Sequence, residues 1–446
     1  MADKLLVRAY NVQVGDCFYV RIPKARKIGD AVDDFHILID CGSKGAAGLL
    51  KAAVEHLETV LPDAGGGKKR LDLLVVTHEH EDHIKGFDPG FFDNIKIENI
   101  WMNTAMDPTH PQAGNTLQLR NLATAAMRNI ASQNLALSPE LQDLVALYGI
   151  NNDGAMTALR TTLPQNNGIA PNYVHAGLTP AKLKLPTLAG AKIKVLSPER
   201  DIDRFYLGAD ADGALNSLSA ANATFRTAPA GAPKTFPANI SKSDFRRLRS
   251  RMMSSAFAFA ELESRVTNNT SIVLLVEWKG KRLLFVGDAE WDDKFKDGKS
   301  NGAWNVMWNQ RKADLNEPID FLKIGHHGSV NSTPWNDEED GEVTEPSTIL
   351  DAILPLPQGN AAPKAKAVVS TARKNYQTIP RAALLVELGK RVKNTRNYKA
   401  ELGADALSLP KYEEFEKQWL DLPQPWRTDC EKLLSVEDFV DVEIEA

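Results

Sequence analysis

The chain has 446 residues, with 53 basic and 58 acidic side chains and a formal net charge of -5. This balance excludes a global electrostatic attraction to nucleic acid, so an anionic substrate would need a locally positive site. No stretch approaches the roughly 18 apolar residues of a membrane span, and the first residues lack the apolar run of a signal peptide. Cys17, Cys41 and Cys430 are far apart and odd in number, which indicates reduced thiols. We therefore expect a cytoplasmic globular protein without membrane contact.

The first hundred residues alternate between predicted strands and one predicted helix. Short segments rich in β-branched or aromatic residues predict the strands, and the spacing of Leu50, Val54 and Leu57 predicts an amphipathic helix. The apolar run at 71–77 is typical of a strand buried on both faces, and the sequence HEHEDH follows it directly. The predicted strands cover 5–10, 17–22, 36–40, 71–77 and 97–102, and the helix covers 45–61.

From about residue 104 to residue 265 the pattern changes to helix and weakly patterned loop. Residues 115–148 and 241–265 have helical periodicity, and the second helix has Ser241 as its predicted N-cap. A strand is predicted at 191–196. Because the motifs on either side need each other, we interpret this region as insertions into a single domain. That domain spans 1–446, and the two insertions, the first of them helical, cover 104–171 and 199–265.

The last third of the chain returns to strands. A hairpin is predicted around Lys279-Gly280, and a buried-looking strand ends in the sequence GHHGS. Two weaker strand candidates follow. The predicted strands cover 270–278, 282–286, 318–324, 366–370 and 439–443.

Four side chains of metal-ligand type lie within six consecutive positions after the strand at 71–77. His78, His80, Asp82 and His83 offer imidazoles and carboxylates, which divalent ions such as zinc accept. Three of the nine histidines fall in this hexapeptide. A solvated loop with coincidental histidines is therefore the weaker interpretation.

Two further strand ends carry the same residue types. Asp288 follows the strand at 282–286, and His326 and His327 follow the strand at 318–324. A lone Asp after a strand is more often a turn residue, and a lone His more often packs in the interior. Together with the hexapeptide, both residues favour a metal site instead.

The sequences THEHEDH (77–83), LLFVGDAE (283–290) and LKIGHHGSVNST (322–333) resemble the metallo-β-lactamase superfamily. Within it, the chain most resembles the hydrolase domain of ComEC-type competence proteins. Weaker similarities to that branch are NVQVGDC (11–17), LIDCG (38–42), NNTSIVLL (268–275), VVSTARKNYQTIP (368–380) and RTD (427–429).

The resemblance implies an α/β fold, the αββα sandwich of that superfamily, with metals at one edge and large insertions, mainly helical. We prefer His326 to His327 as the last ligand because it stands two residues after the strand LKI, and His327 would then orient a substrate oxygen. The implied ligands are His78 and His80 for a first ion, Asp82 and His83 for a second, Asp288 between the two, and His326 to complete the second site.

One position departs from the superfamily's pattern. A third histidine for the first ion is usual after the strand that matches 191–196, but Ser197 and Pro198 stand there. His175 and His110 are the nearby alternatives, although isolated histidines usually pack or face solvent. We expect one or two zinc ions, and manganese becomes plausible as imidazole is lost and carboxylate is kept.

The resemblance favours phosphodiester hydrolysis, with nucleic acid or a nucleotide as substrate. Bound divalent ions lower the pKa of water toward about 7. Asp82 would accept the proton of that water, and Asp82 and His327 are the two predicted catalytic residues. The segment 241–251 contains Arg246 and Arg247, which we expect to bind phosphates. A solvated helix face is an equally weighted interpretation. Backbone N–H groups at Gly328 and Ser329 would bind an anion.

Two other functions stay open. The same ligands serve a hydrolase of a lactone, lactam or thioester, because the ligands fix the reaction type better than the substrate. A non-catalytic, metal-stabilised interaction module is less favoured because HEHEDH and Asp288 are intact. No pattern in the sequence predicts a protein partner.

Overall fold

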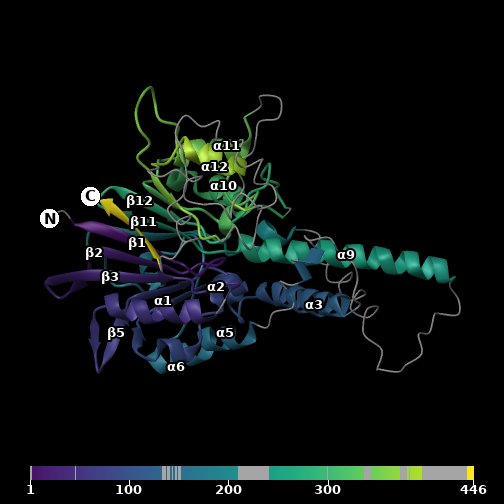
Figure 1. Cartoon of the computed structure of the whole chain (residues 1–446), viewed down its shortest axis with the longest axis horizontal. Coiled ribbons are helices and arrows are strands. Elements are labelled where there is room, and N and C mark those ends of the chain that lie inside the picture. The colour runs from purple at the N-terminus through teal and green to yellow at the C-terminus, as the bar shows by residue number, and fades with distance from the viewer. Residues whose placement is uncertain are drawn as a thin grey trace, which may run out of the picture.

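Short apolar strands and amphipathic helices build four layers, with two β-sheets face to face and helices on both outer faces (Figure 1). This computed structural model confirms the α/β fold class and the αββα order expected from the sequence. The residues that it describes are 3–45, 47–132, 137, 141–142, 144–145, 148, 152–208, 241–298, 300–335, 343–371, 379–380, 382–393 and 439–446.

The first sheet has seven strands in the order β15-β1-β2-β3-β6-β8-β9. Its N-terminal part is antiparallel, with the last strand of the chain beside the first, and β3, β6, β8 and β9 are parallel. The strands are β1 (Lys4–Tyr10), β2 (Phe18–Ile28), β3 (Ala31–Ile39), β6 (Leu73–Val76), β8 (Ile100–Asn103), β9 (Asn172–Val174) and β15 (Phe439–Glu445).

The second sheet has five strands in the order β10-β11-β12-β13-β14. The predicted hairpin is present, and Lys279 and Gly280 both have positive φ in its turn, at 47° and 80°. The strands are β10 (Ala191–Ser197), β11 (Val273–Trp278), β12 (Lys281–Phe285), β13 (Phe321–Lys323) and β14 (Lys366–Val368). A small third sheet contains β4 (Asp63–Gly65), β5 (Lys68–Leu71) and β7 (Ile95–Ile97).

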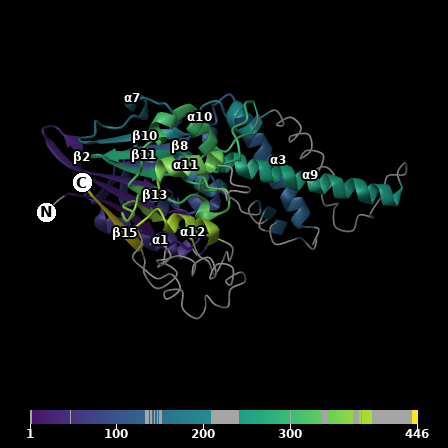
Figure 2. The same cartoon turned by 90° about the horizontal axis from the view of Figure 1, so that it is seen from above.

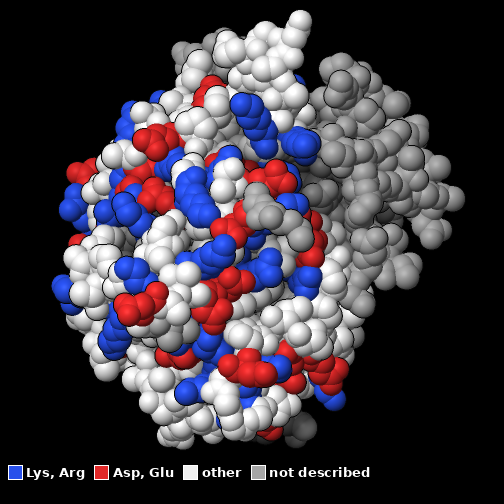
Figure 3. All heavy atoms as spheres, turned by 90° about the vertical axis from the view of Figure 1, so that its left-hand side faces the viewer, with Lys and Arg blue, Asp and Glu red and all other residues white. Residues whose placement is uncertain are grey.

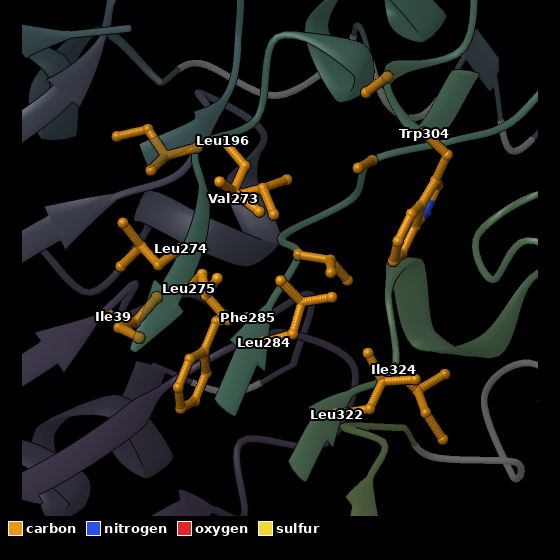
Figure 4. Packing of buried hydrophobic residues seen from close by; sticks show 14 of the residues in the cluster. Ile39, Leu196, Val273, Leu274, Leu275, Leu284, Phe285, Trp304, Leu322 and Ile324 are labelled. Carbon is orange, nitrogen blue, oxygen red and sulfur yellow. The ribbon is translucent and has the colours of Figure 1, made fainter. Parts of the chain in front are cut away.

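Side chains alternate between two hydrophobic layers along the central strands. On β3, Ile37 and Ile39 pack toward the second sheet, whereas Leu38 between them packs with Leu50 and Val54 of α1 (Ala47–Val60). Figure 4 shows Ile39 beside Phe285 and Leu275 of the second sheet. Burying one such side chain contributes about 1.5–3 kcal/mol.

Helices on the two outer faces complete the sandwich. Figure 1 shows α1, α5 (Asp153–Thr157) and α6 (Leu163–Asn167) below the first sheet. It shows α10 (Ala303–Leu315), α11 (Glu345–Ile353) and α12 (Ala382–Gly389) above the second. No helix of the described residues is long and apolar enough to cross a membrane.

Two long helices extend beyond the sandwich. α3 (Ala113–Ala131) and α9 (Lys242–Asn269) lie in contact and project together from one end of the molecule (Figures 1 and 2). The hydroxyl of Ser241 accepts a hydrogen bond from the backbone N–H of Asp244, so the predicted N-cap is confirmed. Described residues of 104–171 are largely helical, while the division into one domain with two insertions stays a prediction.

Candidate metal centre

Three strand ends bring the predicted ligands together. The hexapeptide follows β6, and its last residues form the one-turn helix α2 (Glu81–Ile84). Asp288 follows β12, and His327 follows β13, which is parallel to β12. The residue before Asp288 must be glycine for the two strand ends to pack this closely. Gly287 has φ of 52°, and a Cβ there would lie only 2.9 Å from Ser271. Ligand atoms of His78, His83 and Asp288 all lie within 4.8 Å of one another.

His78 and His80 point ring nitrogens at each other. His78 Nε2 lies 3.1 Å from His80 Nδ1, while His78 Nδ1 lies 3.1 Å from Thr77 Oγ1 and 3.2 Å from Ser271 Oγ. Two nitrogens bound at about 2.0–2.1 Å to one tetrahedral ion are about 3.3 Å apart. Burial lowers the pKa of His80 to about 3 and lowers that of His78 well below its usual value. Both rings are therefore neutral, as metal ligation requires.

A buried carboxylate orients His83. Asp40 Oδ2 lies 2.7 Å from His83 Nδ1, and the same carboxylate accepts hydrogen bonds from the backbone N–H and hydroxyl of Thr77. The opposite ring atom, Nε2, is buried without a hydrogen-bond partner among the described residues, 3.2 Å from Asp288 Oδ2. Burial opposes the charged form, but Asp288 and Asp40 outweigh it and raise the pKa of His83 well above its usual value. Positive charge is thus favoured at this point.

Asp82 and His327 form the other side of the cluster. His327 Nε2 lies 3.1 Å from Asp82 Oδ2, and its Nδ1 lies 2.7 Å from the carbonyl oxygen of Ser370. That carbonyl accepts a hydrogen bond from the proton of Nδ1, so Nε2 is the ring nitrogen that would bind a metal ion. Lys44 Nζ is 3.2 Å from the same carboxyl oxygen of Asp82. Although burial opposes ionisation, Lys44 and His327 hold the pKa of Asp82 well below its usual value.

A buried lysine stands behind Asp288. Lys323 Nζ donates to the carbonyl of Gly287 at 3.0 Å, forms an ion pair with Asp16, and lies 3.9 Å from Asp288 Oδ1. Burial lowers the pKa of Lys323, but Asp16 and Asp288 outweigh that effect and raise it.

The donor set fits divalent cations. Among the described residues, the four buried carboxylates of Asp16, Asp40, Asp82 and Asp288 lie near two ammonium groups, from Lys44 and Lys323, and near the imidazole of His83. Buried charges that lack partners are usually neutralised by coordination to a metal. A metal ion bound here would take the place of the proton on His83 Nε2, and the facing nitrogens of His78 and His80 would be further ligands.

Comparison with known families supports this chemistry. Residues 28–101 match the model of the metallo-beta-lactamase superfamily. That superfamily consists typically of metal-dependent hydrolases that use divalent ions, often zinc. The match covers the HEHEDH motif, while Asp288 and His327 lie outside it. No curated protein sequence matches the chain. The narrower similarity to ComEC-type proteins stays a prediction.

The structure places His327, not the expected His326, beside the other predicted ligands. His326 is 28% exposed, and its Nε2 lies 3.9 Å from Asp288 while its Nδ1 lies 3.7 Å from Glu290. Asp82, His83 and His327 instead have ligand atoms within 4.8 Å of one another. The reason is the backbone, since both histidines have positive φ, at 40° and 54°. This strained turn swings the second ring inward.

The same turn removes a predicted anion site. The N–H groups of Gly328 and Ser329 donate to the carbonyls of Gly325 and His326, at 2.8 and 3.0 Å. They are therefore not available to a substrate anion. The hydroxyl of Ser329 remains, buried and without a partner among the described residues.

Neither alternative third histidine joins the described cluster. His175 Nδ1 lies 2.9 Å from the carbonyl of Ala176, and His110 Nδ1 accepts the backbone N–H of Gln112 at 3.2 Å. No group of candidate ligand atoms among the described residues includes either. Ser197 is fully buried at the usual position of this ligand.

The predicted arginine segment lies far from the candidate metal ligands. The C-terminal end of α9 is at the site, because Ser271 contacts His78. Arg247 is 20 positions earlier than Thr267 on this helix, which amounts to about 30 Å at 1.5 Å per residue. Arg247 is exposed, while the side chain of Arg246 lies outside the described residues. The expectation that this segment lies near the metals is therefore wrong.

Several side chains that hold the ligands in place were not predicted from the sequence. Asp16, Asp40 and Lys323 position His83 and Asp288, and Ser271 positions His78. Asp16 lies in NVQVGDC and Asp40 in LIDCG, two segments that resembled the family. That resemblance was the signal in the sequence that could have identified Asp16 and Asp40, because an isolated Asp after a strand has no specific pattern.

Proposed function

We propose that this chain is a phosphodiester hydrolase that binds two divalent ions, zinc or manganese. One observation carries the proposal: the buried histidines each turn one ring nitrogen toward the cluster while a hydrogen-bond partner holds the other. Asp40 holds Nδ1 of His83, and the carbonyl of Ser370 holds Nδ1 of His327. Such support fixes the tautomer and raises ligand basicity. His78, His80 and Asp288 would hold one ion, and Asp82, His83, His327 and Asp288 the other.

The chemistry follows from this arrangement. When bound, a pair of divalent ions supplies Lewis acidity and water of lowered pKa, and it suits the in-line displacement of phosphodiesters. Asp82 is held ionised by Lys44 and His327, so it can accept a proton from the attacking water. Lys44 is 27% exposed on the solvent side of Asp82, where its charge favours the approach of an anionic phosphate.

Activity measurements test this proposal. Chelator-treated protein would be reloaded with zinc or manganese and given bis(p-nitrophenyl) phosphate, single- and double-stranded DNA, RNA, a lactam, a lactone and a thioester. We expect turnover of phosphodiesters that is lost on chelation. Turnover of the lactam, lactone or thioester alone would replace the proposal by a small-molecule hydrolase. Metal binding with no turnover would point to an interaction module.

Asp82→Asn provides the matched variant. General-base assistance contributes about a hundred- to ten-thousand-fold, so we expect at least a hundredfold loss of turnover. Glu81→Gln is the control, because the neighbouring Glu81 pairs with Lys85 at 2.8 Å instead of the cluster. Full activity of Asp82→Asn would refute this mechanism.

A further inference from the structure

A cavity adjoins the candidate metal centre, and the long helices α3 and α9 supply part of its lining. It has a volume of about 200 Å³, and its lining includes His80, Arg120, Arg128, Arg160 and Glu263. We call it the α3 cavity, after the helix that carries Arg120 and Arg128. His80 belongs to the metal motif, so a group bound in this cavity lies next to the ions. Pockets that bind a whole ligand usually measure about 300–1,000 Å³. The α3 cavity is smaller, so it has room for only part of a substrate.

Two of the cavity's carboxylates are already engaged. Glu79 forms an ion pair with Arg120, whose Nη2 also donates to the carbonyl of Glu79 at 3.2 Å. Glu263 accepts hydrogen bonds from Tyr148 and, at 3.0 Å, from Thr267. Burial raises the pKa of Glu263 despite the nearby guanidinium of Arg120. Neither carboxylate therefore balances the charge of the other two arginines.

Arg128 and Arg160 retain donor capacity toward the cavity. Arg128 is exposed and makes no side-chain hydrogen bond or ion pair with a residue that the structure describes. Arg160 donates from Nη2 to the carbonyl of Met106 at 2.9 Å and also hydrogen-bonds the side chain of Tyr173, while its buried Nε has no partner among the described residues. Asp153, which has an interaction of its own, is the third carboxylate in the described lining. The balance is two guanidinium groups against one carboxylate.

We propose that the α3 cavity binds a second phosphate of the substrate, next to the phosphodiester that is hydrolysed. Guanidinium groups present fixed pairs of N–H donors that match phosphate oxygens, and the amides of Asn121 and Asn152 add neutral donors to the lining. This inference rests on the proposed function, since it assigns the substrate's neighbouring group. The preferred substrate would then be a nucleotide, or the end of a nucleic acid, that carries a phosphate next to the phosphodiester that is hydrolysed.

Matched chromogenic substrates test the proposal. Thymidine 3′-(p-nitrophenyl phosphate) would be compared with and without a 5′-phosphate, and thymidine 5′-(p-nitrophenyl phosphate) with and without a 3′-phosphate. Hydrogen bonds to charged groups contribute about 1.5–3 kcal/mol, so the extra phosphate should lower KM by about tenfold or more in one pair. A carboxymethyl group in its place distinguishes phosphate recognition from binding of any anion, and equal stimulation by it would overturn the phosphate assignment.

Arg128→Gln is the decisive variant, because an exposed helix position tolerates Gln. We expect it to remove the advantage of the phosphorylated substrate and to leave kcat for the unphosphorylated one within about twofold. Arg204→Gln is the control, since Arg204 is exposed on η4 (Asp203–Leu207), outside the cavity lining, and only 3.7 Å from Asp297. An advantage that persists in both Arg128→Gln and Arg160→Gln, or no advantage in either pair, would overturn the proposal.

Failure of the hydrolase proposal would look different. If no p-nitrophenyl ester is turned over, calorimetry of the zinc-loaded protein with thymidine 5′-monophosphate and 3′-monophosphate still tests the cavity. Binding of one of them that is at least about tenfold weaker in Arg128→Gln than in Arg204→Gln would support the cavity's role. Equal binding would overturn it.

Discussion

His326 and His327 are neighbours in the sequence, but their imidazoles meet different groups. His327 faces Asp82 from a ring anchored on the Ser370 carbonyl, whereas His326 is partly exposed beside Glu290. Counting positions from the strand end could not separate them, because the outcome depends on two consecutive residues with positive φ. Sequence patterns do not predict such strain.

We predict that His327→Ala lowers metal content by about one ion per chain, because it removes a ligand whose ring is already held in place. His326→Ala should keep the wild-type metal content. Elemental analysis after gel filtration in buffer with equimolar zinc measures both. If His326→Ala loses the ion while His327→Ala retains it, His326 is the ligand, as its spacing from the strand predicted, and His327 is not.

At the scale of secondary-structure elements, α9 shows what a sequence pattern leaves open. Its helical periodicity and its N-cap at Ser241 were predictable. The direction of the helix was not, because proximity of Arg247 to β11 along the chain does not give proximity in space. Over 28 residues, a helix extends about 42 Å. The arginine-rich end of α9 is consequently distant from the metals, while Glu263 near its other end lines the α3 cavity.

We predict that Arg247→Gln with Arg251→Gln affects only long substrates. At about 3.4 Å per nucleotide, roughly nine nucleotides are needed to span 30 Å. Turnover of a dinucleotide should be unchanged, while binding of a 20-nucleotide single strand should weaken. The slope of log K against log salt should fall by about 1.4, at about 0.7 per phosphate contact. An unchanged slope would leave these arginines as a solvated helix face.

At the scale of the whole molecule, α1 and most strands of the two large sheets were predictable because their apolar residues follow regular periods. The three-residue strand β9 was not predicted. The helices over the second sheet were not predicted either. In the first half of α10 the residues Ala303, Trp304, Asn305, Val306 and Met307 are all buried, so this half of the helix has no exposed polar face that a sequence pattern would show. The charges of the face in Figure 3 are of mixed sign, in agreement with the modest net charge of -5.

We predict that acid destabilises the fold partly through His36. It is a buried residue of β3, with Nδ1 2.8 Å from the Tyr19 hydroxyl, and burial lowers its pKa from 6.5 to about 4. The unfolded chain therefore binds more protons than the folded one between these values, and stability falls as pH drops from 6.5 toward 4. The loss is at most about 3 kcal/mol, at 1.36 kcal/mol per pKa unit.

Urea unfolding of the wild type and of His36→Gln, each at pH 7.5 and pH 5, measures this contribution. Gln retains a hydrogen-bonding side chain but does not titrate. The decrease in the free energy of unfolding between the two pH values should be smaller in His36→Gln. An equal decrease in both proteins would show that other groups account for the acid sensitivity.

Diffraction at the zinc absorption edge, from crystals of the zinc-loaded protein, tests the metal centre most directly. We expect anomalous peaks about 2.0–2.3 Å from His78 Nε2, His80 Nδ1, His83 Nε2 and His327 Nε2, with Asp288 between two peaks if both ions are present. Zinc bound elsewhere on the chain, with no anomalous peak between His83 and Asp288, would contradict the account.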